Sequence, residues 1–134
     1  MAYLLDANVF IQAKNLYYGL EAGGDELAAW AGSRGSGFFL KPDATMLPTL
    51  GSVSAWATGQ RYEPAAASTF LQVADYYLVA HALTHGHTVV THEIASTSTK
   101  KIKIPDACIG LGIKCMTPFE MLRRERARFV LAER

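Results

Sequence analysis

The chain has 134 residues, half of them hydrophobic, and its 13 basic and 12 acidic side chains give a formal net charge of +1. This length and apolar content fit one folded domain and exclude a disordered tail. Residues 1–99 hold 4 basic and 8 acidic side chains, whereas residues 100–134 hold 9 basic and 4 acidic. An acidic body with a basic end can bind cations in one region and polyanions in another, although solvated helix faces explain many of these charges equally well.

The first part of the chain predicts a strand followed by helical segments. Residues 2–6 form an apolar run that ends in Asp6, which predicts a strand with an acid at its carboxyl end. Helices are expected over residues 8–18 and 25–31, and a short strand or extended segment is expected at 38–40. A further helix is predicted from residue 42 to about residue 58, although Pro48 interrupts its pattern.

The second part of the chain alternates helices with strands. Residues 64–85 predict one buried helix or two helices joined near Asp75, followed by a short strand at 87–91. A polar loop over 92–104 and a helical turn then lead to a further strand at 113–116. Strands separated by helices indicate an α/β fold with a parallel sheet covered on both faces.

The two cysteines and the absence of long apolar segments indicate the cellular compartment in which the protein is expected. Cys108 and Cys115 match no zinc or redox spacing and lie in apolar surroundings, so we expect buried free thiols in a reducing cytosol rather than a disulfide. Neither a signal peptide nor a transmembrane helix is expected from the sequence. The sequence therefore predicts a cytoplasmic protein.

Four acidic side chains stand where the predicted strands end or the predicted helices begin. They are Asp6, Asp75, Glu93 and Asp106. Because strand ends and helix starts lie on the same rim of a parallel sheet, these carboxylates are expected to gather there. Gathered carboxylates repel one another unless a divalent cation joins them, and hard oxygen ligands suit Mg²⁺ or Mn²⁺. Such a cluster can activate water and stabilise the charge of a phosphodiester transition state.

Each of the four acids also has a purely structural interpretation. Asp6, Asp75 and Asp106 could each cap the start of a helix, and Glu93 could be an ordinary loop residue. The order of these residues in the sequence does not by itself prove that they converge.

Other chemistry receives less support from the sequence. His92 could act as a base, but His85 and His87 lie nearby in a polar turn, so solvated surface histidines are the simpler interpretation. The chain contains neither GxGxxG nor GxxxxGK[ST], which weighs against a nucleotide-binding enzyme.

The sequence segments around the four acids resemble those of the PIN-domain family, the single-domain nucleases best known as VapC-like toxins of toxin–antitoxin pairs. The likeness is greatest to a PIN-like branch of that family and extends over almost the whole chain. It rests on five segments in this order: YLLDANVFIQAKN at 3–15, GDELA at 24–28 with Trp30, VAD at 73–75 with Ala80, TVVTHE at 88–93 and KIKIPD at 101–106.

The resemblance implies a three-layer α/β/α fold with a central parallel sheet and a metal-dependent ribonuclease site. In that site Asp6, Asp75 and Glu93 are the catalytic and metal-binding acids, and Asp106 is an outer or alternative metal ligand. Asn8 would orient Asp6 or a metal-bound water. The implied cofactor is Mg²⁺ or Mn²⁺, the implied substrate is RNA, and the implied protein partner is an antitoxin.

The chain departs from the family's pattern in one region. PIN domains usually carry a further glutamate on a helix between the first strand and the central helix. Relatives in the PIN-like branch have a helix–strand–helix passage where this chain has only residues 19–23. We therefore expect one helix–strand segment and the usual glutamate to be missing, with Glu21 and then Glu26 as inexact substitutes.

The missing segment is expected to expose apolar surface, which a second subunit could cover. A homodimer is therefore predicted. The candidate contact residues are Tyr17, Tyr18, Leu20, Phe38 or Phe39, and, on the final helix, Met121, Leu122, Phe129 and Leu131.

The basic residues Lys100, Lys101 and Lys103 lie between Glu93 and Asp106 and are expected to hold the RNA backbone. A solvated loop is the alternative interpretation of these lysines.

The leading hypothesis for the whole chain is a metal-dependent ribonuclease, the toxin of a VapBC-type pair, with slow turnover. The first alternative is a non-catalytic relative that keeps the fold and binds RNA or a partner protein. The second alternative is an unrelated Rossmann-like domain, for instance a phosphoacceptor module that uses Asp6.

Overall fold

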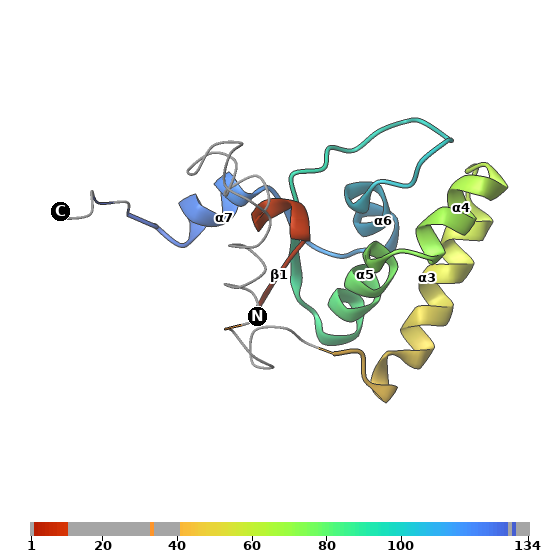
Figure 1. The fold of residues 1–134 in the computed structure, drawn as a ribbon, viewed down its shortest axis with the longest axis horizontal. Coiled ribbons are helices and arrows are strands. Elements are labelled where there is room, and N and C mark those ends of the chain that lie inside the picture. The colour runs from red at the N-terminus through yellow and green to blue at the C-terminus, as the bar shows by residue number, and fades with distance from the viewer. Residues whose placement is uncertain (1, 11–32, 34–40, 129, 131–134) are drawn as a thin grey trace.

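The computed structural model describes residues 2–10, 33, 41–128 and 130 of the chain. These residues form a mixed α/β fold around a three-stranded parallel sheet in the spatial order β1-β2-β3 (Figure 1). The strands are β1 (Tyr3–Leu5), β2 (Thr88–Val90) and β3 (Cys115–Met116). All three residues of β2 are buried, as expected for a β-branched strand that has a neighbour on each side and helices over its faces.

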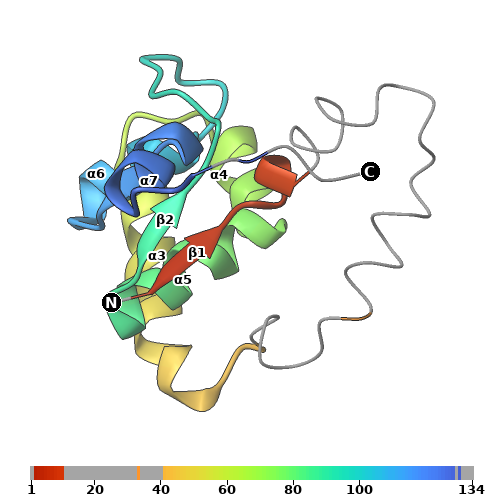
Figure 2. The same cartoon turned by 90° about the vertical axis from the view of Figure 1, so that its left-hand side faces the viewer.

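The described helices pack in layers around this sheet. Helices α5 and α6 lie on one side with α3 outside them, and α7 lies on the other side (Figure 1; Figure 2). The hydroxyl of Tyr3 in β1 donates to Glu125, which ties the end of α7 to the sheet. The helices are η1 (Ala44–Met46), α3 (Leu47–Gly59), α4 (Pro64–Leu71), α5 (Ala74–His85), α6 (Ile104–Leu111) and α7 (Pro118–Arg124).

The structure refines the element boundaries predicted for 42–58. A short 3-10 turn, η1, precedes α3, and Asp43 caps it by accepting a hydrogen bond from the Thr45 N–H at 2.9 Å. Pro48 stands in the first turn of α3, where its missing N–H would have no helical partner in any case. The prediction that Pro48 interrupts the helix is therefore wrong, because Pro48 helps to begin it.

The open choice over residues 64–85 is resolved as two helices. α4 ends at Leu71 and α5 begins at Ala74, so Asp75 lies in the first turn of α5. α6 extends the predicted turn at Pro105 to a helix of eight residues.

Among the described residues no helix is long and apolar enough to cross a membrane. The expectations for 11–32 and 34–40, including Glu21 and Glu26, lie outside the described residues.

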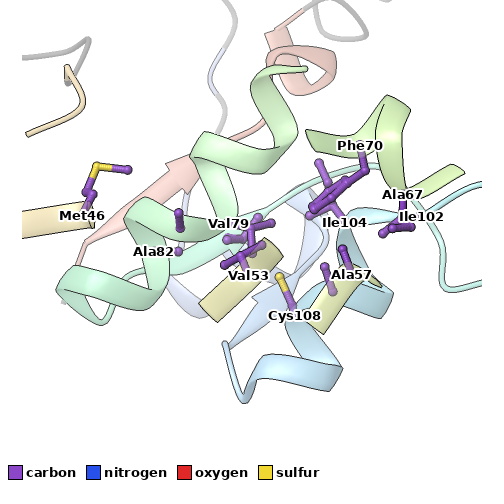
Figure 3. Close-up of a cluster of buried hydrophobic side chains, with 13 residues drawn as sticks. Met46, Val53, Ala57, Ala67, Phe70, Val79, Ala82, Ile102, Ile104 and Cys108 are labelled. Carbon is purple, nitrogen blue, oxygen red and sulfur yellow. The ribbon is translucent and has the colours of Figure 1, made fainter. Parts of the chain in front are cut away.

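The core lies between α3, α5, α6 and the sheet (Figure 3). It includes Val53 of α3, Val79 of α5, Val89 of β2 and Cys108 of α6, all fully buried.

Cys108 and Cys115 are free thiols, but Cys115 is only half-buried. A hydrogen bond between the two thiols raises the pKa of Cys108 and lowers the pKa of Cys115, and burial raises the pKa of Cys108 further.

Helix α6 lies close to Trp56 of α3 at Gly110. A Cβ atom at this position would lie 2.2 Å from Nε1 of Trp56 and 2.5 Å from its Cε2. Gly110→Ala is therefore expected to lower the free energy of unfolding by about 1–3 kcal/mol, the usual cost of overpacking. Gly51→Ala in α3, where nothing lies within 4 Å, is the control and should raise it by about 0.5–1 kcal/mol. Denaturant unfolding of both variants measures the two signs, and equal effects would contradict the close approach.

Candidate functional site

Asp6 and Thr91 leave the sheet side by side at the carboxyl ends of β1 and β2. The Asp6 N–H donates to the Val90 carbonyl at 2.9 Å, and the Thr91 N–H donates to the Met116 carbonyl at 3.1 Å, so the ladder continues past each strand. The buried Thr91 hydroxyl donates to Oδ2 of Asp6 at 2.9 Å. Parallel pairing and this hydrogen bond thus fix the Asp6 carboxylate at the carboxyl edge of the sheet.

Asn8 lies in the helical residues 7–10 that follow β1, and it contacts the segment after β2. Its backbone N–H donates to Oδ1 of Asp6 at 3.4 Å, and its Nδ2 donates to the Thr91 hydroxyl oxygen at 3.4 Å. Its Oδ1 accepts from the His92 N–H at 3.3 Å. These contacts place Asn8 where it can orient Asp6 through the backbone and through Thr91.

Asp75 reaches the same edge from the first turn of α5 and is half-buried there. Burial raises the pKa of Asp75, and the negative charges of Asp6 and Glu93 raise it further, while Lys101 acts to lower it. Like charges raise a carboxyl pKa in this way only when they are close enough to interact. Three carboxylates from three separate segments therefore share one electrostatic environment.

Glu93 also has a structural role. Its N–H donates to the Thr91 hydroxyl oxygen at 3.1 Å, and its Oε2 accepts from the Ile104 N–H at 2.7 Å. Ile104 is the first residue of α6, whose N-terminal N–H groups have no partner within the helix. Glu93 thus satisfies the start of α6 from across the loop, while its charge still acts on Asp75.

Asp106 is linked to a different neighbourhood. Its two carboxylate oxygens accept from the Ser96 N–H at 3.3 and 3.0 Å, which closes the loop that precedes α6. Burial raises the pKa of Tyr62, and the charge of Asp106 adds to this increase. The charges that act on Asp75 come instead from Asp6, Glu93 and Lys101. The described contacts therefore group Asp106 with the loop, and its role as an outer ligand stays a prediction.

We call the edge of the sheet with Asp6, Asp75 and Glu93 the acidic edge. It offers the oxygen ligands of a divalent-cation site, but these ligands are not arranged around one ion. In the part of the chain that the structure describes, no three His, Cys, Asp or Glu side chains are already arranged to coordinate one ion. Carboxylate oxygens are nevertheless the ligands that Mg²⁺ and Mn²⁺ prefer, and a cation would relieve the repulsion at Asp75. Coordination would require the Asp6, Asp75 and Glu93 side chains to rotate towards one another.

The predicted RNA-binding lysines differ in their surroundings. Lys100 and Lys101 are exposed on the loop, and Lys101 is near enough to Asp75 to lower its pKa. Lys103 is half-buried at the N-cap position of α6, where its carbonyl accepts from the Ala107 N–H at 3.2 Å.

Sequence reasoning missed the part played by Thr91. Its hydroxyl donates to Asp6 and accepts from both the Asn8 side chain and the Glu93 N–H. A hydroxyl residue that ends a buried β-branched strand and immediately precedes polar residues was the available signal.

His92, the candidate base, is half-buried and packs its ring edge-on against Phe119 at a centroid distance of 6.1 Å.

Comparison with known proteins gives a family but no activity. A family model described as "Domain of unknown function (DUF4411)" matches residues 19–129. Neither a curated protein nor a solved structure matches the chain. The matched range includes Asp75, Glu93 and Asp106 and begins after Asp6 and Asn8.

Proposed function

The chain belongs to the DUF4411 family, and we propose that it is a metal-dependent ribonuclease that cleaves RNA internally by phosphodiester hydrolysis. The observation that carries this proposal is that the negative charges of Asp6 and Glu93 raise the pKa of Asp75. These three acids come from the end of β1, the start of α5 and the turn after β2. The resemblance of the surrounding segments to PIN domains, including the expected three-layer PIN-like fold, supports the same assignment.

Asp6, Asp75 and Glu93 would hold Mg²⁺ or Mn²⁺. When bound, such an ion lowers the pKa of a water molecule and neutralises charge on the phosphodiester. The chain's own residues supply the positioning, because Thr91 and Asn8 hold Asp6 at the sheet edge. Cleavage of a labelled single-stranded RNA by the purified, tag-free protein with Mn²⁺, compared with EDTA, tests the proposal. We expect slow turnover, because the sequence offers only Glu21 and then Glu26 as inexact substitutes for the helical glutamate usual in PIN domains.

A toxin role in a VapBC-type pair, acting in the cytoplasm on cellular RNA, is part of this proposal. The protein partners would be an antitoxin and a second copy of the chain. Large apolar side chains that are exposed support a protein partner, among them Phe119 of α7 at 61% and Ile109 of α6 at 73% exposed. On α7, Met121 and Leu122 are half-buried. The other predicted dimer residues, Tyr17, Tyr18, Leu20, Phe38, Phe39, Phe129 and Leu131, lie outside the described residues.

A non-catalytic RNA-binding or protein-binding relative is the second candidate function. The contact that favours it is the hydrogen bond from the Ile104 N–H to Glu93, because an acid that caps α6 is less free to serve a metal. The same holds for Asp106, whose two oxygens accept from Ser96. This candidate predicts no difference in cleavage between Mn²⁺ and EDTA, and its RNA-binding form predicts RNA binding without cleavage.

If the chain binds RNA, with or without cleaving it, binding should depend on Lys100 and Lys101. The double variant Lys100→Ala/Lys101→Ala is expected to weaken RNA binding and to reduce the slope of log affinity against log salt by about 1.4, because each phosphate contact to a single strand contributes about 0.7. Fluorescence anisotropy across a salt series measures the slope. Lys103 is left in place because of its position at the start of α6.

The matched control for this experiment is Lys41→Ala/Lys114→Ala. Lys41 precedes η1 and Lys114 precedes β3, so both exposed side chains lie away from the acidic edge. The control should keep the wild-type slope. An unchanged slope in Lys100→Ala/Lys101→Ala would remove these lysines from the RNA-binding surface.

A further inference from the structure

Three of the chain's four histidines meet in one cluster, which we call the histidine cluster: His81, His85 and His87. Their ring centroids are separated by 4.7 Å between His81 and His85, 5.7 Å between His81 and His87, and 5.8 Å between His85 and His87. Asp43 adjoins the cluster, with its Oδ2 3.4 Å from Nε2 of His85. Four side chains with nitrogen or oxygen donors are thus in contact.

The fold brings these residues together from three segments. His81 and His85 are four residues apart on α5 and so lie on one face of it. Gly86 ends α5 in the left-handed conformation with φ of 68°, and this turns the chain so that His87, which directly precedes β2, lies beside the helix. The His87 N–H donates to the Ala82 carbonyl of α5 at 3.0 Å. Asp43 caps η1, which packs against the same helix.

The histidine cluster is separate from the acidic edge. Asp75 stands in the first turn of α5 and His85 in its last turn. At a rise of about 1.5 Å per residue, these two positions lie about 15 Å apart along the helix axis. The amino end of β2, next to His87, is likewise the opposite end of the strand from Thr91.

The environment of His87 favours a bound cation over a solvated histidine. His87 is half-buried, and its Nδ1 is buried without a hydrogen-bond partner among the described residues, which leaves a costly unsatisfied atom. The solvated-surface interpretation suits the exposed His85 but not His87.

The spacing of the rings also suits one metal ion. Imidazole nitrogens bind zinc at about 2.0–2.1 Å in tetrahedral geometry, which puts the centroids of two bound rings about 5 Å apart. The three observed separations lie on either side of this value. Imidazole ligands suit zinc and its neighbours in the transition series, whereas the acidic edge suits Mg²⁺ or Mn²⁺.

We propose that His81, His85 and His87 form a zinc-binding site, with the Asp43 carboxylate as the fourth ligand. The rings of His81 and His87 stack with 15° between their planes, and no three donors among the described residues already have coordinating geometry. Binding therefore turns the rings about their side-chain torsions. The exposed His85 can do this at little cost, and the half-buried His87 gains a partner for Nδ1 if it turns with them.

Zinc titration of the full-length, tag-free protein tests the site. Calorimetry at neutral pH is expected to show one saturable zinc ion per chain, and NMR should show shifts in the imidazole resonances of His81, His85 and His87. His85→Ala should weaken binding by more than about tenfold, since loss of even an outer partner of a metal ligand costs this much. The double variant His81→Ala/His85→Ala should abolish it. His85 is exposed, so its substitution is not expected to disturb folding, and circular dichroism checks this.

His92→Ala is the matched control, because it removes the one histidine outside the cluster. It should keep the wild-type zinc affinity. The proposal is overturned if wild type shows no saturable zinc binding, if zinc affinity is unchanged in His81→Ala/His85→Ala, or if His92→Ala lowers it equally. Zinc held by Cys108 and Cys115 would give the second of these results.

Discussion

Asp6→Asn is expected to abolish metal-dependent RNA cleavage, with a fall in rate of at least about 100-fold. That factor corresponds to about 2.7 kcal/mol of transition-state stabilisation, less than the several kcal/mol that a bound metal ion supplies. The amide keeps the shape of the side chain and can still accept the hydrogen bond from Thr91. It loses the negative charge that would hold the cation, so the loss of activity should come without a loss of fold.

The assay compares wild type and Asp6→Asn, each with Mn²⁺ and with EDTA. Glu63→Gln is the control: it makes the same carboxylate-to-amide change on an exposed side chain before α4, and it should leave cleavage unchanged. Equal residual cleavage in all four reactions would indicate a contaminating nuclease and would favour the non-catalytic candidate. Rapid wild-type cleavage that Asp6→Asn removes would show instead that another acid takes the place of the missing glutamate.

The sequence predicted the parts of the fold that local signals determine. The β-branched run at β2 and the glycine after His85 gave the strand and the end of α5 correctly. Pro48 was misinterpreted because a proline can either break a helix or begin one, and only the 3-10 turn before it decides between the two. The length of α6 was underestimated because its start is satisfied by Glu93, which lies 11 residues earlier across an irregular loop.

The acidic edge was predictable to the extent that topology alone determines it. Parallel strands bring Asp6 and the residues after β2 to one edge, and the break between α4 and α5 adds Asp75. The contacts that organise this edge were not predictable, since the Thr91 hydroxyl reaches Asp6 across 85 positions in the sequence. The histidine cluster was missed for a similar reason, because His87 joins it only after the reversal at Gly86.

Asp75→Asn is expected to change activity and stability in opposite directions. Burial and the charges of Asp6 and Glu93 raise the pKa of Asp75, so the folded protein holds this proton more tightly than the unfolded chain. The resulting stability is fully present below the pKa of the unfolded carboxyl, about 3.9, and is lost as pH rises through the folded pKa. Lys101 favours the ionised form, but the net pKa is raised, so the contributions of burial, Asp6 and Glu93 are larger.

At neutral pH, therefore, ionised Asp75 destabilises the fold. Asp75→Asn removes that charge and should raise the free energy of unfolding by about 0.5–2 kcal/mol, the usual gain from improving a surface-charge arrangement. For a domain of this size, each kcal/mol raises Tm by about 3–5 °C. Thermal melts at about pH 7 and about pH 3 measure the effect, and the difference from wild type should shrink at the lower pH, which lies below the pKa of Asp75 in both the folded and the unfolded state.

Glu120→Gln is the control for the stability experiment, since Glu120 is also an acid in the first turn of a helix but is exposed. It should leave Tm unchanged or lower it slightly, because an acid at this position favours the helix dipole. A lower Tm for Asp75→Asn at neutral pH would mean that favourable contacts hold the ionised carboxylate, and the shared acidic site would then be excluded.

A titration with Mn²⁺ distinguishes repulsion among the three carboxylates from binding of a cation by them. A cation that joins the three carboxylates binds only the folded state and should raise the wild-type Tm with increasing concentration. Asp75→Asn has already lost the repulsion that the cation would relieve and has also lost one ligand, so its Tm should respond far less. If Mn²⁺ shifts neither protein while Asp75→Asn is still more stable, the carboxylates do repel one another but hold no cation, and the RNA-binding or protein-binding candidate becomes the better account of this acidic edge.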